Sequence, residues 1–194
     1  MAARRMILAL ALPLLLSGCA TYRQVHALDR VDFSIDDVAH VSLAGINLSG
    51  FSEVTDLGLA DAAALANAVR TRNVPLSLEV IVLADNPEDN DDARLVRMDW
   101  TLFLQGRETL SGVIANDTML PRGQPTSLAI QVNLNLADFF DGTARDLFEL
   151  ALSFTGMGGA PKNVTLTALP TVQTVFGPLT YTEPIRIVSA NVGR

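Results

Sequence analysis

The sequence is poor in the residues from which most active sites are built. Its 194 residues include one cysteine and two histidines, and only 6% of them are aromatic. A single cysteine can form neither an internal disulfide nor a thiolate zinc site. The histidines, His26 and His40, belong to no His-Glu-x-x-His zinc motif, and no Gly-x-Ser-x-Gly nucleophile turn occurs. We therefore expect no catalytic residues, no metal site and no cofactor, and hence no enzyme.

Positive charge is also scarce. The chain has 14 Lys and Arg residues against 21 Asp and Glu residues, which gives a net charge of −7. Binding to nucleic acid relies on basic side chains that neutralise phosphates, so we expect no nucleic-acid partner. The densest acidic stretch, Asp85–Asp92, is either a calcium loop or a solvated connection. It lacks Asp-x-Asp-x-Asp-Gly spacing, and Pro87 stands where a ligand would be needed, which favours the solvated loop.

Apolar runs are short. The run Met6–Leu16 has 11 residues, whereas a membrane-spanning helix needs about 20. It follows Arg4 and Arg5 and ends in Leu16-Ser17-Gly18-Cys19, which resembles the lipobox of exported bacterial lipoproteins. The resemblance implies cleavage before Cys19 and acylation of this sole cysteine. The alternative is an ordinary signal peptide followed by a buried cysteine.

This signal divides the chain into residues 1–18 as signal peptide, 19–28 as acylated tether and 29–194 as a single domain. Loss of the two signal-peptide arginines leaves 12 basic residues against 21 acidic ones, about −9. Several acyl chains on Cys19 would anchor the protein firmly. Because Ala20 rather than Asp follows Cys19, the resemblance implies the outer membrane, facing the periplasm. The expected partners are this membrane, through the acyl chains, and an unidentified protein or lipid.

Period-two alternation of apolar and polar residues predicts a mainly β, antiparallel sandwich. Leu128–Leu136 is the clearest case, with Leu, Ile and Val on one face and Gln and Asn on the other. About seven strands with turn signals between them are typical of a sandwich. The expected strands are Val31–Asp36, Ala39–Leu48, Leu76–Ala84, Leu95–Gln105, Leu128–Leu136, Val164–Ala168 and Pro184–Val188.

Two segments interrupt this alternation and predict accessory helices. Leu59–Arg72 is rich in alanine, and Thr143–Phe154 mixes leucines with charged residues. We expect these helices to cap the ends of the sandwich or to cover an edge. In the first helix the expected apolar stripe consists of Ala62, Leu65, Ala66 and Val69. Among the strands, the alternation places the side chains of Trp100 and Val132 inside the sandwich.

The segment 76–136 resembles the late embryogenesis abundant group two family, also called the water stress and hypersensitive response (WHy) domain. The likeness rests on Asn86-Pro87 after a strand, on glycines at Gly106 and Gly112 that suit turns, and on Leu120-Pro121-Arg122-Gly123 before a second alternating strand. It implies an immunoglobulin- or fibronectin-like sandwich, no catalytic residues and a role in protection under stress. Some relatives are associated with lipid handling.

Apolar side chains on both faces of some strands leave two functions open. Phe139 and Phe140 lie between a strand and the second helix, and Ile81 and Leu83 alternate with apolar Val80 and Val82. If helices cover these faces, the chain is a lipoprotein with an envelope stress-protection or partner-binding role. If they do not, Phe139 and Phe140 line a cleft for an acyl chain, and the chain is a periplasmic lipid or hydrophobic-ligand carrier.

Overall fold

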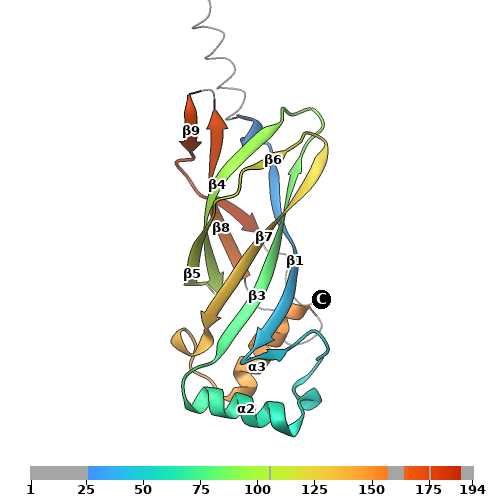
Figure 1. The fold of residues 1–194 in the computed structure, drawn as a ribbon, viewed down its shortest axis with the longest axis vertical. Helices are drawn as coiled ribbons and strands as arrows, with labels where there is room; N and C mark the ends of the chain where they lie inside the picture. The colour runs from blue at the N-terminus through green and yellow to red at the C-terminus, as the bar shows by residue number, and fades with distance from the viewer. Residues whose placement is uncertain (1–25, 105, 157–163, 175, 189–194) are drawn as a thin grey trace, which may run out of the picture.

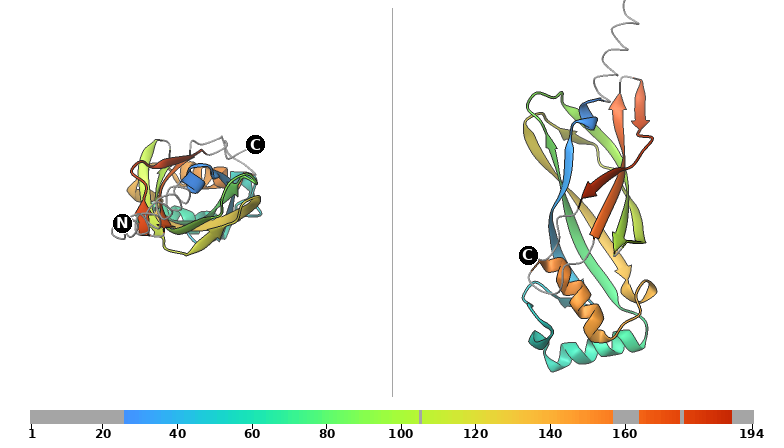
Figure 2. Two further views of the ribbon diagram at one scale, coloured as in Figure 1. Left: turned by 90° about the horizontal axis from the view of Figure 1, so that it is seen from above. Right: turned by 180° about the vertical axis from the view of Figure 1, so that it is seen from behind.

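The computed structural model describes residues 26–104, 106–156, 164–174 and 176–188. Within these ranges ten strands form one continuous hydrogen-bonded network that curls into two facing layers, so the molecule is an elongated β-sandwich (Figures 1 and 2). All strand pairs but one are antiparallel. The predicted fold class, a mainly β antiparallel sandwich with accessory helices, is confirmed.

The first layer is built on two long central pairings. Strand β3 runs antiparallel to β1 on one side and to β7 on the other. Val80 lies opposite Ile130, and Leu78 lies opposite Val132, and all four side chains are at least 95% buried. The alternation read from the sequence therefore gives the correct inward face. The strands of this layer are β1 (Asp32–Leu43), β2 (Ile46–Asn47), β3 (Pro75–Asn86) and β7 (Gln124–Asn135).

The second layer has β4 and β8 at its centre. Its order is β5-β4-β8-β10, with β6 paired to β4 and β9 paired to β8. Among the described residues, one parallel pair, Ser34 of β1 with Val188 of β10, links it to the first layer. The strands of this layer are β4 (Ala93–Leu104), β5 (Arg107–Ile114), β6 (Thr118–Leu120), β8 (Val164–Thr174), β9 (Gly177–Thr180) and β10 (Ile185–Val188).

The strand predictions need two corrections. Val31–Asp36 and Ala39–Leu48 were expected as separate strands, but they form the continuous β1 and the short β2. Two register shifts interrupt the pairing of β1 with β3, and His40 has a φ of 54°, so bulges disturb the alternation without ending the strand. The short edge strands β5, β6 and β9 were not predicted as strands, because their sequences have little alternation.

Gly112 has a different role from the one expected. It was expected at a turn, but it lies within β5 directly opposite Trp100 of β4 and has no positive φ. A Cβ atom at this position would lie 2.4 Å from Cζ2 of Trp100. Gly112 therefore makes room for the indole ring, which is 94% buried. Gly106 does occupy the predicted turn, with a φ of 76° between β4 and β5.

The helices gather at the lower end of the sandwich as drawn in Figure 1, so the prediction that they cap an end is confirmed. A capping box starts α3, because the Thr143 and Asp146 side chains each accept a hydrogen bond from the other residue's backbone N–H. The Phe148 ring of α3 is fully buried and meets Phe51 edge to face, with ring centroids 5.8 Å apart. The helical segments are α2 (Leu59–Arg70), α3 (Ala144–Leu152), and the 3₁₀ turns η1 (Val54–Asp56), η2 (Leu136–Asp138) and η3 (Ser153–Thr155).

The buried face of α2 differs from the predicted stripe. Only Leu65 and Ala68 are buried, whereas Ala62 and Ala66 are exposed. An alanine-rich helix has no strong apolar face of its own, so the surface that it packs against decides which residues are buried. At its first position Leu59 is 93% exposed.

Two buried asparagines organise the upper end. The side-chain amide of Asn86 donates to the carbonyl of Leu120 at 2.7 Å, and Asn90 donates to Asn86 Oδ1 at 2.6 Å. Asn90 also donates to the backbone carbonyl of Ala27 at 2.7 Å. Ala27 and Leu28 are 99% and 97% buried, so the last part of the expected tether 19–28 belongs to the folded domain. The domain thus begins no later than His26, before the boundary expected at residue 29.

Candidate functional site

Two residues of the expected ligand cleft lie against the core. Phe139 and Phe140 are both half-buried where η2 leads into α3, and both pack on buried apolar side chains. Neither lines the two cavities described below. The expectation that they form a cleft remains a prediction, although their packing favours coverage by the fold. The expected lipidation site, Cys19, lies outside the described residues.

The acidic segment Asp85–Asp92 connects β3 to β4 at the upper end. Its carboxylates are exposed, and two of them are partnered within the fold: Asp89 with Arg30 at 2.6 Å, and Asp92 with the backbone N–H of Arg122 at 3.0 Å. The Arg30 guanidinium lowers the pKa of the Asp89 carboxyl. Within the described ranges, no group of three or more His, Cys, Asp or Glu residues is placed to hold a metal ion.

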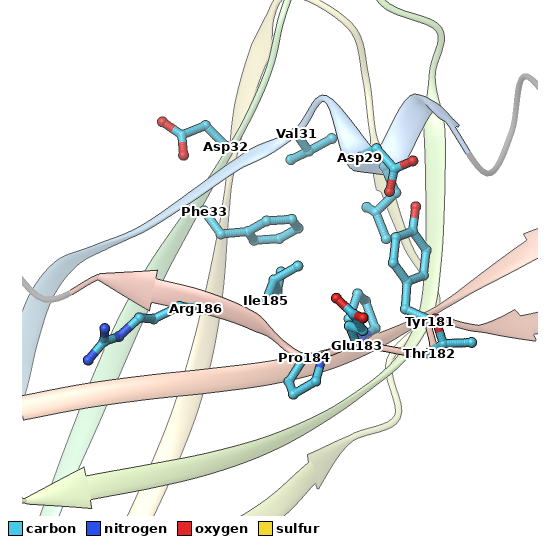
Figure 3. A pocket seen from close by; sticks show the side chains of 12 residues that line it. Asp29, Val31, Asp32, Phe33, Tyr181, Thr182, Glu183, Pro184, Ile185 and Arg186 are labelled. Carbon is cyan, nitrogen blue, oxygen red and sulfur yellow. The ribbon is translucent and has the colours of Figure 1, made fainter. Parts of the chain in front are cut away.

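One cavity, of about 450 Å³, lies at the junction of the two layers, where β1 and β10 share one residue pair within the described residues. We call it the seam pocket. Figure 3 shows the side chains of Phe33 and Ile185 facing into it, with the Asp29 carboxylate close to the Tyr181 hydroxyl. Its volume falls within the range of small-molecule sites. The lining residues are Leu28, Asp29, Val31, Asp32, Phe33, Pro170, Tyr181, Thr182, Glu183, Pro184, Ile185 and Arg186.

The topology explains why this pocket is open. Next to β8, β10 pairs over four residues, whereas along β1 Val188 has a partner and the preceding residues 185–187 have none. The first residues of both strands therefore separate. Side chains, rather than backbone hydrogen bonds, line the space between the two strands. Phe33, which is 92% buried, belongs to the core on one side and to the pocket wall on the other.

Tyr181 and Asp29 form the polar contact of the pocket. The Tyr181 hydroxyl donates a hydrogen bond to the Asp29 carboxylate, which also lies 3.2 Å from His26 Nδ1. Burial, and then the hydrogen bond to Asp29 and its charge, raises the pKa of Tyr181 well above its usual range. The phenol therefore keeps its proton at neutral pH, and it serves as a hydrogen-bond donor rather than as a base or nucleophile.

The charges around the seam pocket favour a particular kind of ligand. Three exposed carboxylates, on Asp29, Asp32 and Glu183, stand against the single guanidinium of Arg186. The lining is mixed: leucine, valine, isoleucine, proline and phenylalanine side chains lie beside these charged groups and beside Thr182 and Tyr181. This arrangement suits a molecule or peptide segment with an apolar part and a cationic or uncharged polar end, and it disfavours an anionic one.

A second cavity, of about 220 Å³, lies among η1 and α3 at the opposite end of the molecule. Its walls include Val54 and Leu152, and Arg145 and Glu149 form an ion pair of 2.8 Å across one turn of α3. Glu149 raises the pKa of Arg145, which remains charged. Because both charges already satisfy each other, this cavity offers less to a polar ligand than the seam pocket does.

Reasoning from the sequence did not find the seam pocket. Phe33 and Ile185 lie in segments that were predicted as strands, but they are far apart in the chain and nothing in either segment indicates that their strands meet at one residue pair. The pairing of Tyr181 with Asp29 likewise depends on tertiary contact. The sequence offers one weak indication of this site: Tyr181 is one of two tyrosines in the chain.

Comparison with known proteins yields only distant similarities. No family model matches the chain, and no curated protein matches it either. Among solved structures, it is similar to the solution structure of a candidate late embryogenesis abundant (LEA) protein, with a TM-score of 0.38, 13% identity, and coverage of 97% of this chain and 88% of that one. It is also similar to the crystal structure of a protein from Archaeoglobus fulgidus, with a TM-score of 0.31, 10% identity, and coverage of 60% and 86%. Similarities at this level assign neither activity nor partners, so the WHy resemblance stays a prediction.

Proposed function

We propose that this chain is a non-enzymatic lipoprotein of the outer membrane, acylated at Cys19, whose sandwich binds a partner in the bacterial envelope. The observation that carries the proposal is the sole cysteine, placed at the end of a short apolar run and followed by Ala20. No helix among the described residues is long and apolar enough to cross a membrane. The folded domain follows Cys19 closely, since Ala27 is already in its core.

The anchor is tested by the variant Cys19→Ser. In the native chain, mass spectrometry of the amino-terminal peptide should show acyl groups on Cys19, and the protein should fractionate with the outer membrane. The variant should lose both the acyl groups and the processing before residue 19. A matched variant, Ala20→Asp, should keep the acyl groups but move to the inner membrane. If Cys19→Ser fractionates like the native chain, the proposed anchor is wrong.

The seam pocket is the proposed binding site for the partner. It combines apolar side chains with exposed carboxylates, and Ile185 is one of the apolar side chains and is half-buried. Ile185→Trp should fill the space and prevent binding. Val54→Trp, a change of the same kind at a half-buried position of the second cavity, is the control. A partner that is recovered from envelope extracts with the native chain and the control, but not with Ile185→Trp, would identify the site.

A second function, transport of a lipid or another hydrophobic ligand, is supported by the same apolar side chains. The ligand would place its apolar part between Phe33 and Ile185 and its polar end near Asp29. Native mass spectrometry and lipid extraction distinguish the two functions. A lipid that is bound by the native chain and lost with Ile185→Trp supports the carrier. A protein partner without bound lipid supports the binding module.

A further inference from the structure

We propose that Phe176, which directly precedes β9, inserts into the membrane interface, so that the sandwich stands with its upper end on the bilayer. The proposal rests on the anchor at Cys19 proposed above. It assigns a second membrane contact, made by the folded domain itself, to a hairpin that has no role in the seam pocket beyond leading into Tyr181.

The hairpin exposes two large apolar side chains. Phe176 is 72% exposed and Leu179 is 45% exposed. Exposure of single apolar residues is common in soluble proteins, so exposure alone assigns no function. Here the two side chains lie on one short hairpin at the edge of a layer, since β9 pairs only with β8. An exposed phenylalanine beside the end of a hairpin strand is suited to insertion between lipid head groups.

Hydrogen bonds link the end of β8 to Phe176 and to the start of β9. The hydroxyl of Thr174 donates to the carbonyl of Gly177 at 2.7 Å and accepts from the backbone N–H of Phe176 at 3.2 Å. Gly177 has a φ of 112°, a conformation that other residues rarely adopt. Further along the hairpin the hydroxyls of Thr171 and Thr180 lie 2.9 Å apart. The Phe176 side chain is already exposed and needs no rearrangement to meet a membrane.

The position of the chain's folded start indicates where the membrane would be. The helical residues 26–29 and the adjoining ends of β8 and β9 both lie at the upper end of the molecule (Figure 1). The bond from Asn90 to the carbonyl of Ala27 holds this start in place. Seven residues lead from Cys19 to His26, and an extended chain of that length reaches at most about 25 Å. An acylated Cys19 therefore keeps the upper end close to the lipid head groups.

Negative charge at the upper end favours zwitterionic over anionic lipid. The acidic segment Asp85–Asp92 connects β3 to β4 at the upper end, and Asp89 is paired there with Arg30. Carboxylates near a membrane are repelled by anionic lipids over roughly a Debye length, about 8 Å at physiological ionic strength. The expected partner is thus a zwitterionic bilayer surface, with burial of apolar side chains as the driving force.

The test places a fluorescent probe at each end of the molecule. The chain from Cys19 onward contains every described residue, and its sole thiol can be coupled to a maleimide lipid in phosphatidylcholine vesicles. This coupling supplies the anchor whether or not cells acylate Cys19. Phe176→Trp places an indole directly before β9. Leu59→Trp is the control, because Leu59 is 93% exposed and begins α2 at the opposite end. The native Trp100 is buried and provides a common background.

Brominated phosphatidylcholine in the vesicles reports contact between the indole and the lipid. On coupling, the added emission of the Phe176→Trp variant should fall by about half or more and shift to shorter wavelength, because an indole among lipid head groups is shielded from water. The emission of the Leu59→Trp variant should not change. Acrylamide should quench the Leu59→Trp variant equally before and after coupling, and the Phe176→Trp variant at least threefold less after coupling.

Two outcomes would overturn the insertion: equal quenching of both variants by the brominated lipid, or an unchanged acrylamide response of the Phe176→Trp variant. Absence of acyl groups on Cys19 in cells would instead contradict the proposed anchor. The vesicle result does not depend on that modification, so failure of the insertion and failure of the anchor are distinguishable.

Discussion

Replacing Gly112 with alanine tests the packing of the sandwich most directly. Gly112 lies opposite Trp100 across β4 and β5, and its backbone has no positive φ that would itself exclude alanine. The new Cβ would lie 2.4 Å from Cζ2, 2.7 Å from Cε2 and 3.1 Å from Nε1 of Trp100. Contacts below 3.0 Å are not tolerated, so either the indole or the β5 backbone must shift.

The magnitude follows from two opposing effects. Adding a methyl group to a packed core costs about 1–3 kcal/mol. Replacing glycine with alanine reduces the conformational entropy of the unfolded chain, which stabilises the fold by about 0.4–1 kcal/mol. We therefore expect Gly112→Ala to lower the free energy of unfolding by about 1–2 kcal/mol. For a domain of this size the thermal midpoint should fall by roughly 2–8 °C.

Urea unfolding followed by circular dichroism measures the effect. Gly50→Ala is the matched control, because nothing lies within 4 Å of a Cβ at that position, and it should change the stability by less than about 0.5 kcal/mol. Trp100→Phe removes the atoms that meet the new Cβ. In that background Gly112→Ala should cost at least about 1 kcal/mol less than in the native chain. Equal costs of Gly112→Ala in both backgrounds would refute the steric explanation.

Other substitutions test the core, the upper end and the seam pocket. Trp100→Ala should cost about 3–5 kcal/mol of unfolding free energy, and Asn133→Ala, on the solvent face, less than about 0.5 kcal/mol; equal costs in denaturant titrations would show that the strand faces are misassigned. Asn86→Ala should cost about 1–3 kcal/mol because it leaves the Leu120 carbonyl unpaired, and an unchanged urea midpoint would contradict the role of this amide. Burial raises the pKa of Tyr181 in the folded state, so its contribution to stability is fully present below the unfolded pKa of about 10 and is lost as pH rises further. Tyr181→Phe should therefore flatten the loss of thermal midpoint that the native chain shows from about pH 10 upward. A chelator should leave the midpoint of the native chain unchanged; a fall would revive the calcium interpretation of the acidic segment.

The sequence was most informative where the rule is local. Alternation in β3 and β7 placed Val80 and Val132 on the buried face, because successive side chains of a strand point to opposite sides and only one side can meet the core. Asn86-Pro87 marked the end of β3, since proline cannot donate to the ladder. The leucines mixed with charged residues over Thr143–Phe154 predicted α3, because such a pattern gives a helix one apolar face.

The sequence was less informative where an element depends on its neighbours. Bulges let β1 continue through a broken pattern, and its pairing with β3 over both halves holds it together. The face of α2 was misassigned because alanines fit an exposed or a buried position equally well, and only tertiary packing, which includes contact with α3, buries Ala68. The role of Gly112 was missed because a glycine that admits a large ring looks the same in sequence as a glycine at a turn.

The sequence by itself determined the composition of any site that the protein can have: one thiol at the end of an apolar run, few histidines and an acidic surface. These are properties of residues and of short segments, so they can be read from the sequence without a structure. The tertiary structure decided where such residues meet. It brought Phe33 and Ile185 to one pocket, joined Tyr181 to Asp29, and placed the adjoining ends of β8 and β9 at the same end as the start of the folded chain. Such contacts arise from the pairing of strands that are distant in sequence, which no local pattern specifies.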